Sequence, residues 1–354
     1  MVKDASEIKW GTFVLSEVFT IESTSSGIDK NKLINKKGMI PYITRTDENN
    51  GIANLIGKQD EKYFKNKGNV ITIGLDTQTV FYQAKEFYTG QNIQILYNKK
   101  LNNVNALFLI PLLEKIIEKF SWGGYGATLT RLRKSRVMLP INSDKEPDWD
   151  FMESYIKKKE TYSLMKLKSY LDEKLSVMQD KAYLYSDDFF DMMKWGEFLI
   201  ENLFNVNRGR RLIKKDRKNG KIAFYSATEY NNGVTDFISN PLFVEKNKIL
   251  VTIFGDAFFA EEDFTASDDV TILGNNKLNK YNGLFVCEMI KNNKEKFKFG
   301  YKCFSERIKR QTILLPINEE NNEPDWDFME SYIRKIKYEK LNEYSNYIEE
   351  RLNN

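Results

Sequence analysis

A ten-residue sequence, PDWDFMESYI, occurs twice in this chain, at residues 147–156 and 324–333. Each copy follows an apolar stretch that ends in Leu-Pro-Ile-Asn, at residues 139–142 and 315–318, and each precedes a long, highly charged segment. A repeat of this length constrains the architecture more than any other feature, because each copy belongs to one repeated structural unit. The sequence therefore predicts two similar units in tandem, each a globular body followed by a helix.

Shorter internal matches support this division. Trp10-Gly-Thr-Phe corresponds to Trp195-Gly-Glu-Phe, and residues 87–96 correspond to residues 264–273. Between these anchors the two units diverge, whereas the PDWDFMESYI block is identical in both. The two bodies are therefore expected to carry out different versions of one task. The two junctions are expected to meet the same environment, which is either each other or a repeated partner.

Composition limits the classes of function. The chain has 354 residues, enough for two domains, and its net charge of +4 permits nucleic-acid binding without indicating it. It contains no histidine, which counts against catalysis by removing the commonest general base and zinc ligand. Cys287 and Cys303 fit no zinc motif and indicate a reduced, cytoplasmic protein. The longest apolar run, residues 106–113, is too short to span a membrane.

Strand and helix patterns alternate within each body. Runs rich in β-branched residues predict strands at residues 70–73, 93–97 and 137–139, and again at 249–253, 270–273 and 312–315. Helical spacing of apolar residues predicts a helix over residues 103–120, with a counterpart at 279–297. Each body is therefore predicted to be mixed α/β (α+β).

The charged segments after each repeat carry apolar residues at steps of three and four, which is typical of a coiled-coil seam. In the first segment these are Leu164, Leu167, Leu171, Leu175, Met178 and Ala182, and in the second Leu341, Tyr344, Ile348 and Leu352. Asp148 or Asp150 is expected to cap the first helix, and Asp325 or Asp327 the second.

One stretch is strongly basic. Residues 208–218 contain seven basic residues and one acidic residue, and the matching part of the first unit is much less basic. Arginine and lysine side chains bind DNA phosphates and release counterions. Arg208, Arg210, Arg211 and Lys214 are therefore candidates for phosphate contacts, although a solvated loop explains the stretch equally well.

Further cations precede each Leu-Pro boundary, and polar turns occupy matching positions in the two units. Arginine recognises guanine by two parallel hydrogen bonds, and hydroxyl groups bind phosphate. The candidates before the boundaries, expected on strand-like or loop backbone, are Thr128, Arg131, Arg133 and Arg136, and Arg307, Lys309 and Arg310. The candidates in the turns at residues 44–50 and 226–232 are Thr44, Arg45, Thr46, Ser226 and Thr228. Instead of contacting DNA, the cations could form a charged strand edge that discourages aggregation, and the polar residues could serve ordinary β-turn chemistry.

The repeated Pro-Asp-Trp-Asp sequence is superficially similar to a nuclease motif, but helix-like sequence follows it, without a paired strand carrying Glu-x-Lys. A helix cap with an aromatic staple formed by Trp149 and Trp326 is the simpler interpretation. The chain also lacks a GK[ST] phosphate loop and a GxGxxG motif.

The tandem plan of two bodies, each followed by a long helix after a Leu-Pro boundary, resembles the specificity subunits of type I restriction–modification systems. The Pro-Asp-Trp-Asp-Phe-Met block is similar to that of specificity subunits from two-component type IIB systems. The resemblance implies target recognition domains at residues 1–148 and 189–325. It also implies spacer helices at residues 149–188 and 326–354, which pair as an antiparallel coiled coil.

The resemblance further implies a non-catalytic DNA sequence-specificity subunit. Each domain would read one half of a bipartite site in double-stranded DNA, and the coiled coil would set the spacing. Two copies of a DNA methyltransferase subunit would dock at the junctions through Trp149, Phe151, Trp326 and Phe328. S-adenosylmethionine and magnesium would bind to partner subunits, with no cofactor or metal in this chain.

A restriction subunit or fused nuclease would complete the complex, and the sequence does not separate a type I assembly from a type IIB one. Two alternatives stay open. One is a nuclease or other DNA enzyme with an unrecognised carboxylate site. The other is a coiled-coil scaffold that does not bind DNA.

Overall fold

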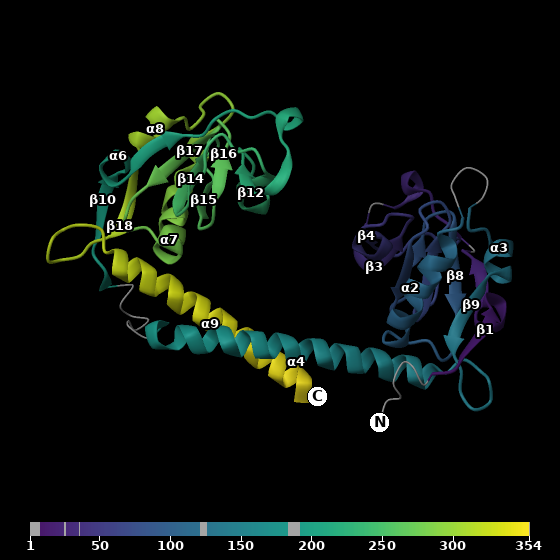
Figure 1. The fold of residues 1–354 in the computed structure, drawn as a ribbon. Helices are drawn as coiled ribbons and strands as arrows, with labels where there is room; N and C mark the ends of the chain where they lie inside the picture. Colours follow the sequence, from purple (N-terminus) through teal and green to yellow (C-terminus); the bar gives the residue numbers. More distant parts are fainter. Residues whose placement is uncertain (1–7, 25, 35, 121–125, 183–191, 354) are drawn as a thin grey trace. The chain divides into compact units, whose positions relative to one another are not determined.

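The structure is a computed structural model that describes residues 8–24, 26–34, 36–120, 126–182 and 192–353 (Figure 1). The chain divides into two compact units, Met1–Met165 and Lys166–Asn354. The division falls inside helix α4 (Trp149–Ala182), so the first part of this helix belongs to the first unit and the remainder to the second.

Each body begins and ends in a two-stranded antiparallel ribbon. Strand β1 (Trp10–Val14) pairs with β9 (Arg136–Pro140), and Trp10 lies opposite Pro140. Strand β10 (Trp195–Leu199) pairs with β18 (Thr312–Pro316) in the same way, with Trp195 opposite Pro316. The Trp-Gly-x-Phe and Leu-Pro anchors found in the sequence are therefore the two sides of one ribbon.

Besides the ribbon, the described residues of each body form two larger sheets, which have the same strand order in both units. The four-stranded sheet of the first unit is antiparallel and consists of β2 (Thr20–Ser23), β8 (Ile93–Tyr97), β5 (Val70–Gly74) and β6 (Val80–Gln83). Its three-stranded sheet consists of β4 (Ile52–Ile56), β3 (Lys37–Ile43) and β7 (Tyr88–Thr89), and β7 runs parallel to β3.

The second unit repeats both sheets. Its four-stranded sheet consists of β11 (Asn205–Arg208), β17 (Val270–Gly274), β14 (Lys248–Thr252) and β15 (Ala257–Ala260). Its three-stranded sheet consists of β13 (Val234–Ile238), β12 (Asn219–Tyr225) and β16 (Phe264–Ala266). All six predicted strands are present, and the mixed α/β prediction is confirmed.

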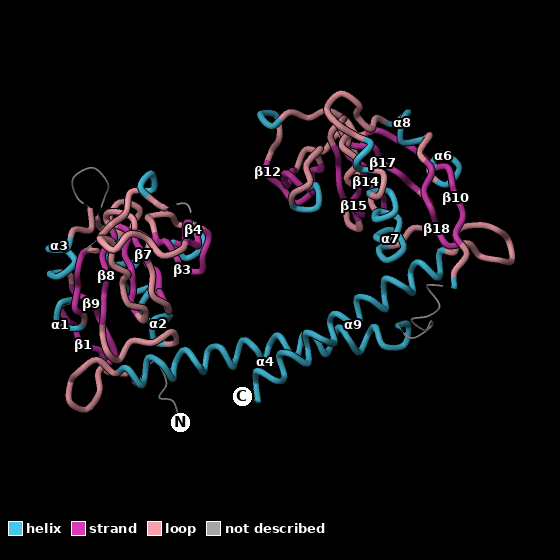
Figure 2. Tube along the Cα trace, turned by 180° about the vertical axis from the view of Figure 1, so that it is seen from behind, coloured by secondary structure: helices cyan, strands magenta, loops and turns pink. Residues whose placement is uncertain are grey.

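One helix packs on the four-stranded sheet of each body (Figure 2). Helix α2 (Asn105–Ile117) buries Leu109 and Leu113, and helix α7 (Lys280–Lys291) buries Val286 and Ile290. Both are shorter than predicted. After α7 the chain forms a separate 3₁₀ turn, η6 (Lys294–Lys296). In the described part of the chain, short α-helices also lie next to the ribbons and sheets: α1 (Leu15–Val18), α3 (Leu129–Lys134), α6 (Ile200–Leu203) and α8 (Ser305–Lys309).

The repeated aspartates cap the two long helices. The backbone N–H of Phe151 donates to Asp148 Oδ1 at 2.9 Å, at the start of α4. The N–H of Phe328 donates to Asp325 Oδ1 at 2.9 Å, at the start of α9 (Trp326–Asn353). Each carboxylate accepts from an amide that has no partner within its helix, so the first aspartate of each predicted pair is the cap.

Within the second unit, the later part of α4 packs on α9. Ser345 Oγ donates to Asp172 Oδ1 at 3.0 Å, and Lys168 Nζ lies 3.6 Å from Glu349 Oε2. Residue numbers rise along α4 as they fall along α9, so these contacts are antiparallel. Leu171, Met178 and Ile348 of the predicted seam are buried.

Tyr344 was predicted to be in the seam, but its side chain is exposed and Ser345 is buried instead. The face of α9 that meets α4 is therefore rotated by one residue at this position. The side chain of Ala182 lies outside the described residues. None of the helices in the described ranges is long and apolar enough to cross a membrane.

Candidate nucleic-acid interface

Several loops of the second unit are joined into one surface, which we call the loop end. Figure 1 shows it beside α8 and away from the start of α9. It consists of residues 208–218, 226–232, 253–256, 267–269 and 294–304. Backbone hydrogen bonds connect these loops: Arg210 N donates to Ala266 O, Ser267 N to Tyr225 O, Ile253 N to Asp269 O and Cys303 N to Ile253 O.

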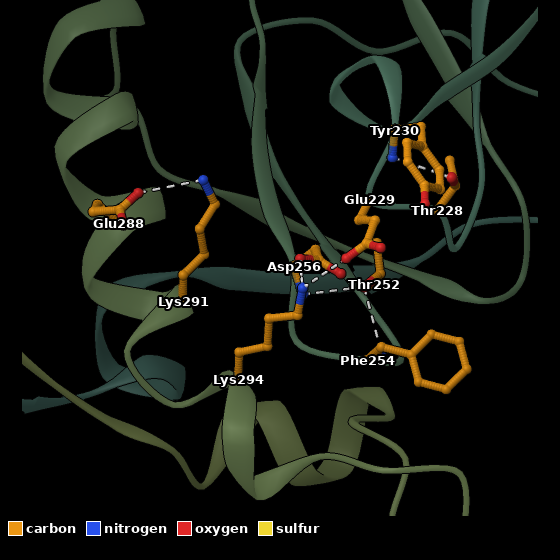
Figure 3. A network of polar contacts seen from close by, with 9 residues as sticks. All are labelled: Thr228, Glu229, Tyr230, Thr252, Phe254, Asp256, Glu288, Lys291 and Lys294. Atoms are coloured by element: carbon orange, nitrogen blue, oxygen red, sulfur yellow. Dashed lines mark hydrogen bonds and ion pairs between the residues drawn. The ribbon is translucent and has the colours of Figure 1, made fainter. Parts of the chain in front are cut away.

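Lys294 fixes the polar turn at residues 226–232 to this surface (Figure 3). Its Nζ lies 3.3 Å from Glu229 Oε2 in the turn and 2.5 Å from Asp256 Oδ1 in the β14–β15 hairpin. Asp256 is buried, and its N–H donates to Thr252 Oγ1 at 3.1 Å. The hydrogen bond with Asp256 raises the pKa of Lys294. The ammonium group is therefore charged at neutral pH, and the contact is lost only as pH rises through that raised pKa.

The corresponding turn of the first unit is fixed by a different pair. Arg45, in the turn at residues 44–50, forms an ion pair with Asp76 in the β5–β6 hairpin. Asn49 and Asn50 have positive φ angles of 48° and 59°, which asparagine tolerates better than most residues. Turn chemistry therefore explains these two asparagines. Thr46 Oγ1 accepts from Glu48 N at 3.2 Å, within the same turn.

The matching turn of the second unit has the same backbone conformation with different side chains. Asn231 and Asn232 also have positive φ angles, of 50° and 51°. Ser226 Oγ contacts Thr235 Oγ1 at 3.1 Å, and Thr228 Oγ1 accepts from Tyr230 N at 3.2 Å. Thr44, Thr46, Ser226 and Thr228 are all partly buried, so they support the turns from within.

The basic stretch separates into cations held by the protein and cations that face solvent. Arg208 Nε donates to Asp268 O at 2.6 Å, and Arg217 lies 3.9 Å from the centroid of the Phe224 ring. Arg211 is 3.9 Å from Asp268 Oδ2 and remains exposed. Arg210 and Lys214 are exposed and have no side-chain partner among the described residues. These two are the best placed for phosphate contacts.

The arginines before the Leu-Pro boundaries lie on helices, so the predicted strand-like or loop backbone is wrong for most of them. Arg131 and Arg133 are in α3, and Arg307 and Lys309 are in α8. The buried side chains of Leu132 and Ile308 hold these short helices to the body. Arg136 does begin a strand, β9.

Three of these arginines are engaged within the protein. Arg131 Nη1 donates to Gly126 O at 2.9 Å, and Arg133 Nη2 donates to Ile21 O at 2.7 Å. Arg307 Nη1 donates to Lys302 O at 2.6 Å. Among the other candidates, Lys309 pairs with Glu306 at 2.7 Å, whereas Thr128 and Arg310 are exposed.

The aromatic residues of the repeated block pack inside their own units. Trp149 lies edge-on to Phe19, with ring centroids 6.2 Å apart, and Trp326 lies edge-on to Phe204 at 6.3 Å. Trp149, Trp326 and Phe328 are buried, and Phe151 is half-buried. Three of the four side chains predicted to dock a methyltransferase subunit are thus enclosed within their own units. They form the aromatic staple that was the alternative interpretation.

Polar contacts around the staple are also duplicated. Asn102 Nδ2 donates to Glu153 Oε2 at 2.8 Å, and Asn279 Nδ2 donates to Glu330 Oε2 at 2.6 Å. The identity of the two blocks thus reflects two identical attachments of a helix to a body.

Exposed apolar residues are repeated next to this staple, and the sequence did not single them out as a surface. Trp10 stacks on Phe108 of α2 and Trp195 stacks on Phe285 of α7, with centroids 6.3 and 6.2 Å apart. We call the two sets the junction patches; they are Trp10, Leu107 and Met138 in the first unit and Trp195, Leu284 and Leu314 in the second. All six are exposed, and their positions correspond in the two units.

The family model of the type I restriction modification DNA specificity domain matches residues 7–168 and again residues 192–348. The chain belongs to this family. The specificity subunit is also 34% identical over 341 residues to the Type II restriction enzyme BgcI specificity subunit S.BcgI of Heyndrickxia coagulans. That match covers 93% of this chain and 95% of the relative.

The fold of the specificity subunit is similar to a solved structure, the S subunit of a type I restriction-modification system from M. genitalium. The TM-score is 0.54 at 14% identity, with 98% of this chain and 94% of the other covered. Together with the family match, the two tandem recognition domains identify a specificity subunit of a restriction–modification system, and not its catalytic component. The loop end and the junction patches are its two candidate working surfaces.

Proposed function

We propose that each recognition domain reads one half of a bipartite site in double-stranded DNA. The second domain would use its loop end, and the first domain the corresponding loops, which include the turn at residues 44–50 and the β5–β6 hairpin. The observation that carries this proposal is one scaffold, matched twice by a DNA specificity model, with different side chains holding the corresponding polar turns of the two domains. Arg45 and Asp76 hold the turn of the first domain, whereas Lys294 holds that of the second through Asp256 and Glu229. A constant scaffold with variable loops is suited to recognising two different sequences.

We propose that α4 and α9 act as the spacer between the half-sites. Their antiparallel contacts, Asp172 with Ser345 and Lys168 with Glu349, support this role. Linking two binding domains makes the second binding event intramolecular, so the affinity for a correctly spaced site exceeds that of either domain alone. Spacing is then selected together with sequence.

Methyltransferase subunits are proposed to dock at the junction patches, one copy on each domain. The patches support this role because they repeat the same exposed apolar chemistry while the side chains that hold the polar turns differ. Exposed apolar clusters on a protein surface mark interaction sites, and aromatic residues are enriched in such interfaces. Two equivalent patches fit two copies of one partner.

The catalytic chemistry is proposed to belong to those partners. S-adenosylmethionine and magnesium would bind there, and a restriction subunit or a nuclease fused to the methyltransferase would cut DNA. The similarity to a Type II specificity subunit supports a type IIB assembly over a type I one. The two buried free cysteines, Cys287 and Cys303, support a cytoplasmic location.

A map of modified bases in host DNA tests the proposed function. We expect that deleting this gene, with the partner genes intact, removes methylation at one bipartite motif, and that restoring the gene restores it. The motif would give both half-sites and the spacer length. An unchanged map from a strain whose partner genes are expressed would contradict the proposal.

Replacing Arg210 and Lys214 together by glutamine is expected to weaken DNA binding to all sequences. Each lost phosphate contact reduces the slope of log K against log salt by about 0.9, so the double variant should lose about 1.8. Binding measured over a range of salt concentrations checks this. Lys340→Gln on α9 is the control, because that side chain is also exposed but lies far along the sequence from the loop end. If the slope equals that of the unmodified protein, Arg210 and Lys214 do not contact DNA phosphates.

A further inference from the structure

A tight turn at the loop end of the second domain presents a phenylalanine to solvent. Tyr301 N donates to Lys298 O at 2.8 Å and Lys298 N donates to Tyr301 O at 3.3 Å, which leaves Phe299 and Gly300 at the tip. The Phe299 side chain is 84% exposed. Apart from Gly300 and its two chain neighbours, no residue has a heavy atom within 4 Å of the position that a Cβ on Gly300 would occupy, so the tip stands clear of the body.

The base of this turn is held firmly. Phe297 is buried and stacks on Tyr301, with centroids 6.2 Å apart and an interplanar angle of 5°. The Arg307 guanidinium lies 4.1 Å from the centroid of the Tyr301 ring. Cys303 N donates to Ile253 O, which joins the turn to the β14–β15 hairpin. The exposed ring is therefore carried on an ordered support, and little conformational entropy is lost when it binds.

Cations lie along the loop that carries the exposed ring. Lys298 is exposed beside it in sequence, and Lys302 Nζ lies 5.3 Å from the centroid of the Phe299 ring. Arg208, at the start of the basic stretch, lies 5.4 Å from the Phe304 ring at the end of the same loop. Phe299 is the most exposed of three solvent-facing aromatic rings in this loop, with Tyr301 and Phe304, and rings among positive charges fit a ligand that has both negative charge and flat apolar faces. Nucleic-acid bases beside their phosphates have both properties.

A protein ligand fits this feature less well. Apolar protein interfaces need a continuous patch. The other exposed rings of this loop, Tyr301 and Phe304, each lie against an arginine guanidinium, and the second junction patch lies on other elements, β10, α7 and β18.

We propose that Phe299 is a wedge that stacks on a base of the second half-site and opens the base stack there. The inference rests on the proposed function and adds a mechanical role to it. Apolar side chains that enter a base step unstack and kink the duplex. An enzyme that modifies a base must first take that base out of the stack, so a wedge supplied by the specificity subunit would lower the free energy needed for this step.

The test uses the full complex with its methyltransferase and a duplex carrying 2-aminopurine at successive positions of the second half-site. The fluorescence of this base rises when it is unstacked. We expect a rise at one step with the unmodified subunit, loss of the rise in Phe299→Ala, and retention in Phe299→Trp. The affinity of Phe299→Ala for its site should fall on the order of 10-fold.

Phe237→Ala is the matched control. Phe237 is another exposed phenylalanine of the same domain, on β13 opposite Ala223 in the ladder rather than at the loop end. It should leave both the fluorescence and the affinity unchanged. Loss of the signal in both variants would overturn the assignment of the wedge to Phe299.

The remaining outcomes separate this inference from the proposed function. If the unmodified complex selects its bipartite site but Phe299→Ala changes neither fluorescence nor affinity, the wedge is wrong and the proposed function stands. If Phe299→Ala instead weakens assembly with the methyltransferase, the ring belongs to a protein interface and the wedge is again wrong. If the unmodified complex selects no bipartite site, both are wrong.

Discussion

The Trp326→Ala variant is expected to lose about 3–5 kcal/mol of the free energy of unfolding of the second unit. The Trp326 side chain is only 8% exposed and belongs to the same core cluster as Phe204, Leu315 and Met329. Its removal leaves a cavity where α9 begins, so the helix loses its attachment to the body as well as buried apolar area. Urea unfolding of the full chain, followed by far-ultraviolet circular dichroism, measures the change. The transition that reports the second unit should move to lower urea, while that of the first unit should not.

A second tryptophan of the same unit provides the control. Trp195 is 36% exposed and contacts Phe285 on one face of its ring. Trp195→Ala should therefore cost about 1 kcal/mol, which is typical of one aromatic pair. Equal destabilisation by the two variants would show that Trp326 does not attach the helix as the structure indicates.

The Leu314→Glu variant is expected to bind one methyltransferase subunit instead of two. Leu314 is 52% exposed on the outer side of the β10–β18 ribbon, so the variant should fold normally. When the methyltransferase subunit docks, the introduced carboxylate would be buried without a partner. The affinity of that interface should therefore fall by at least about 2 kcal/mol, or roughly 30-fold. Native mass spectrometry of the assembled complex counts the copies directly.

The first unit gives the mirror experiment. Met138→Glu, at the corresponding position of β9, should remove the other copy, and the double variant should bind none. Leu242→Glu is the control, because Leu242 is an exposed apolar residue of the second unit outside the junction patch. Two copies bound to the double variant would place the docking surface elsewhere.

The elements of the repeated scaffold can be predicted from the sequence because the residues that determine each of them lie close together in the chain. The strands at residues 70–73 and 249–253 are runs of β-branched residues, and Asp148 and Asp325 cap their helices through an amide three residues away. The seam on α4 is readable for the same reason, since Leu171 and Met178 follow helical spacing.

Contacts between distant residues explain what the sequence did not show. Arg133 donates to the carbonyl oxygen of Ile21, 112 positions away, and nothing near Arg133 in the sequence indicates that partner. Helices α3 and α8 are also too short to display two full turns of periodicity, so their arginines were assigned to strand-like or loop backbone.

Identity between two repeats shows that two positions share an environment without showing what that environment is. Trp149 and Trp326 pack on Phe19 and Phe204 of their own bodies, and nothing in the repeated sequence indicates these contacts. Phe299 illustrates the opposite difficulty. Its neighbour Phe297 looks the same in sequence, yet one ring is buried and the other is exposed at the tip of the turn.

The two-stranded ribbons, β1–β9 and β10–β18, determine how such a chain can change during evolution. Because Trp10 lies opposite Pro140 and Trp195 opposite Pro316, the chain leaves each body beside the point where it entered. Each body is therefore an insert in a frame made of the ribbon and the helix. An insert whose ends meet can diverge or be exchanged as a whole while the frame keeps its geometry. A lineage of such proteins can acquire a new half-site by replacing one insert, and the distance between half-sites and the shared modification machinery are inherited unchanged.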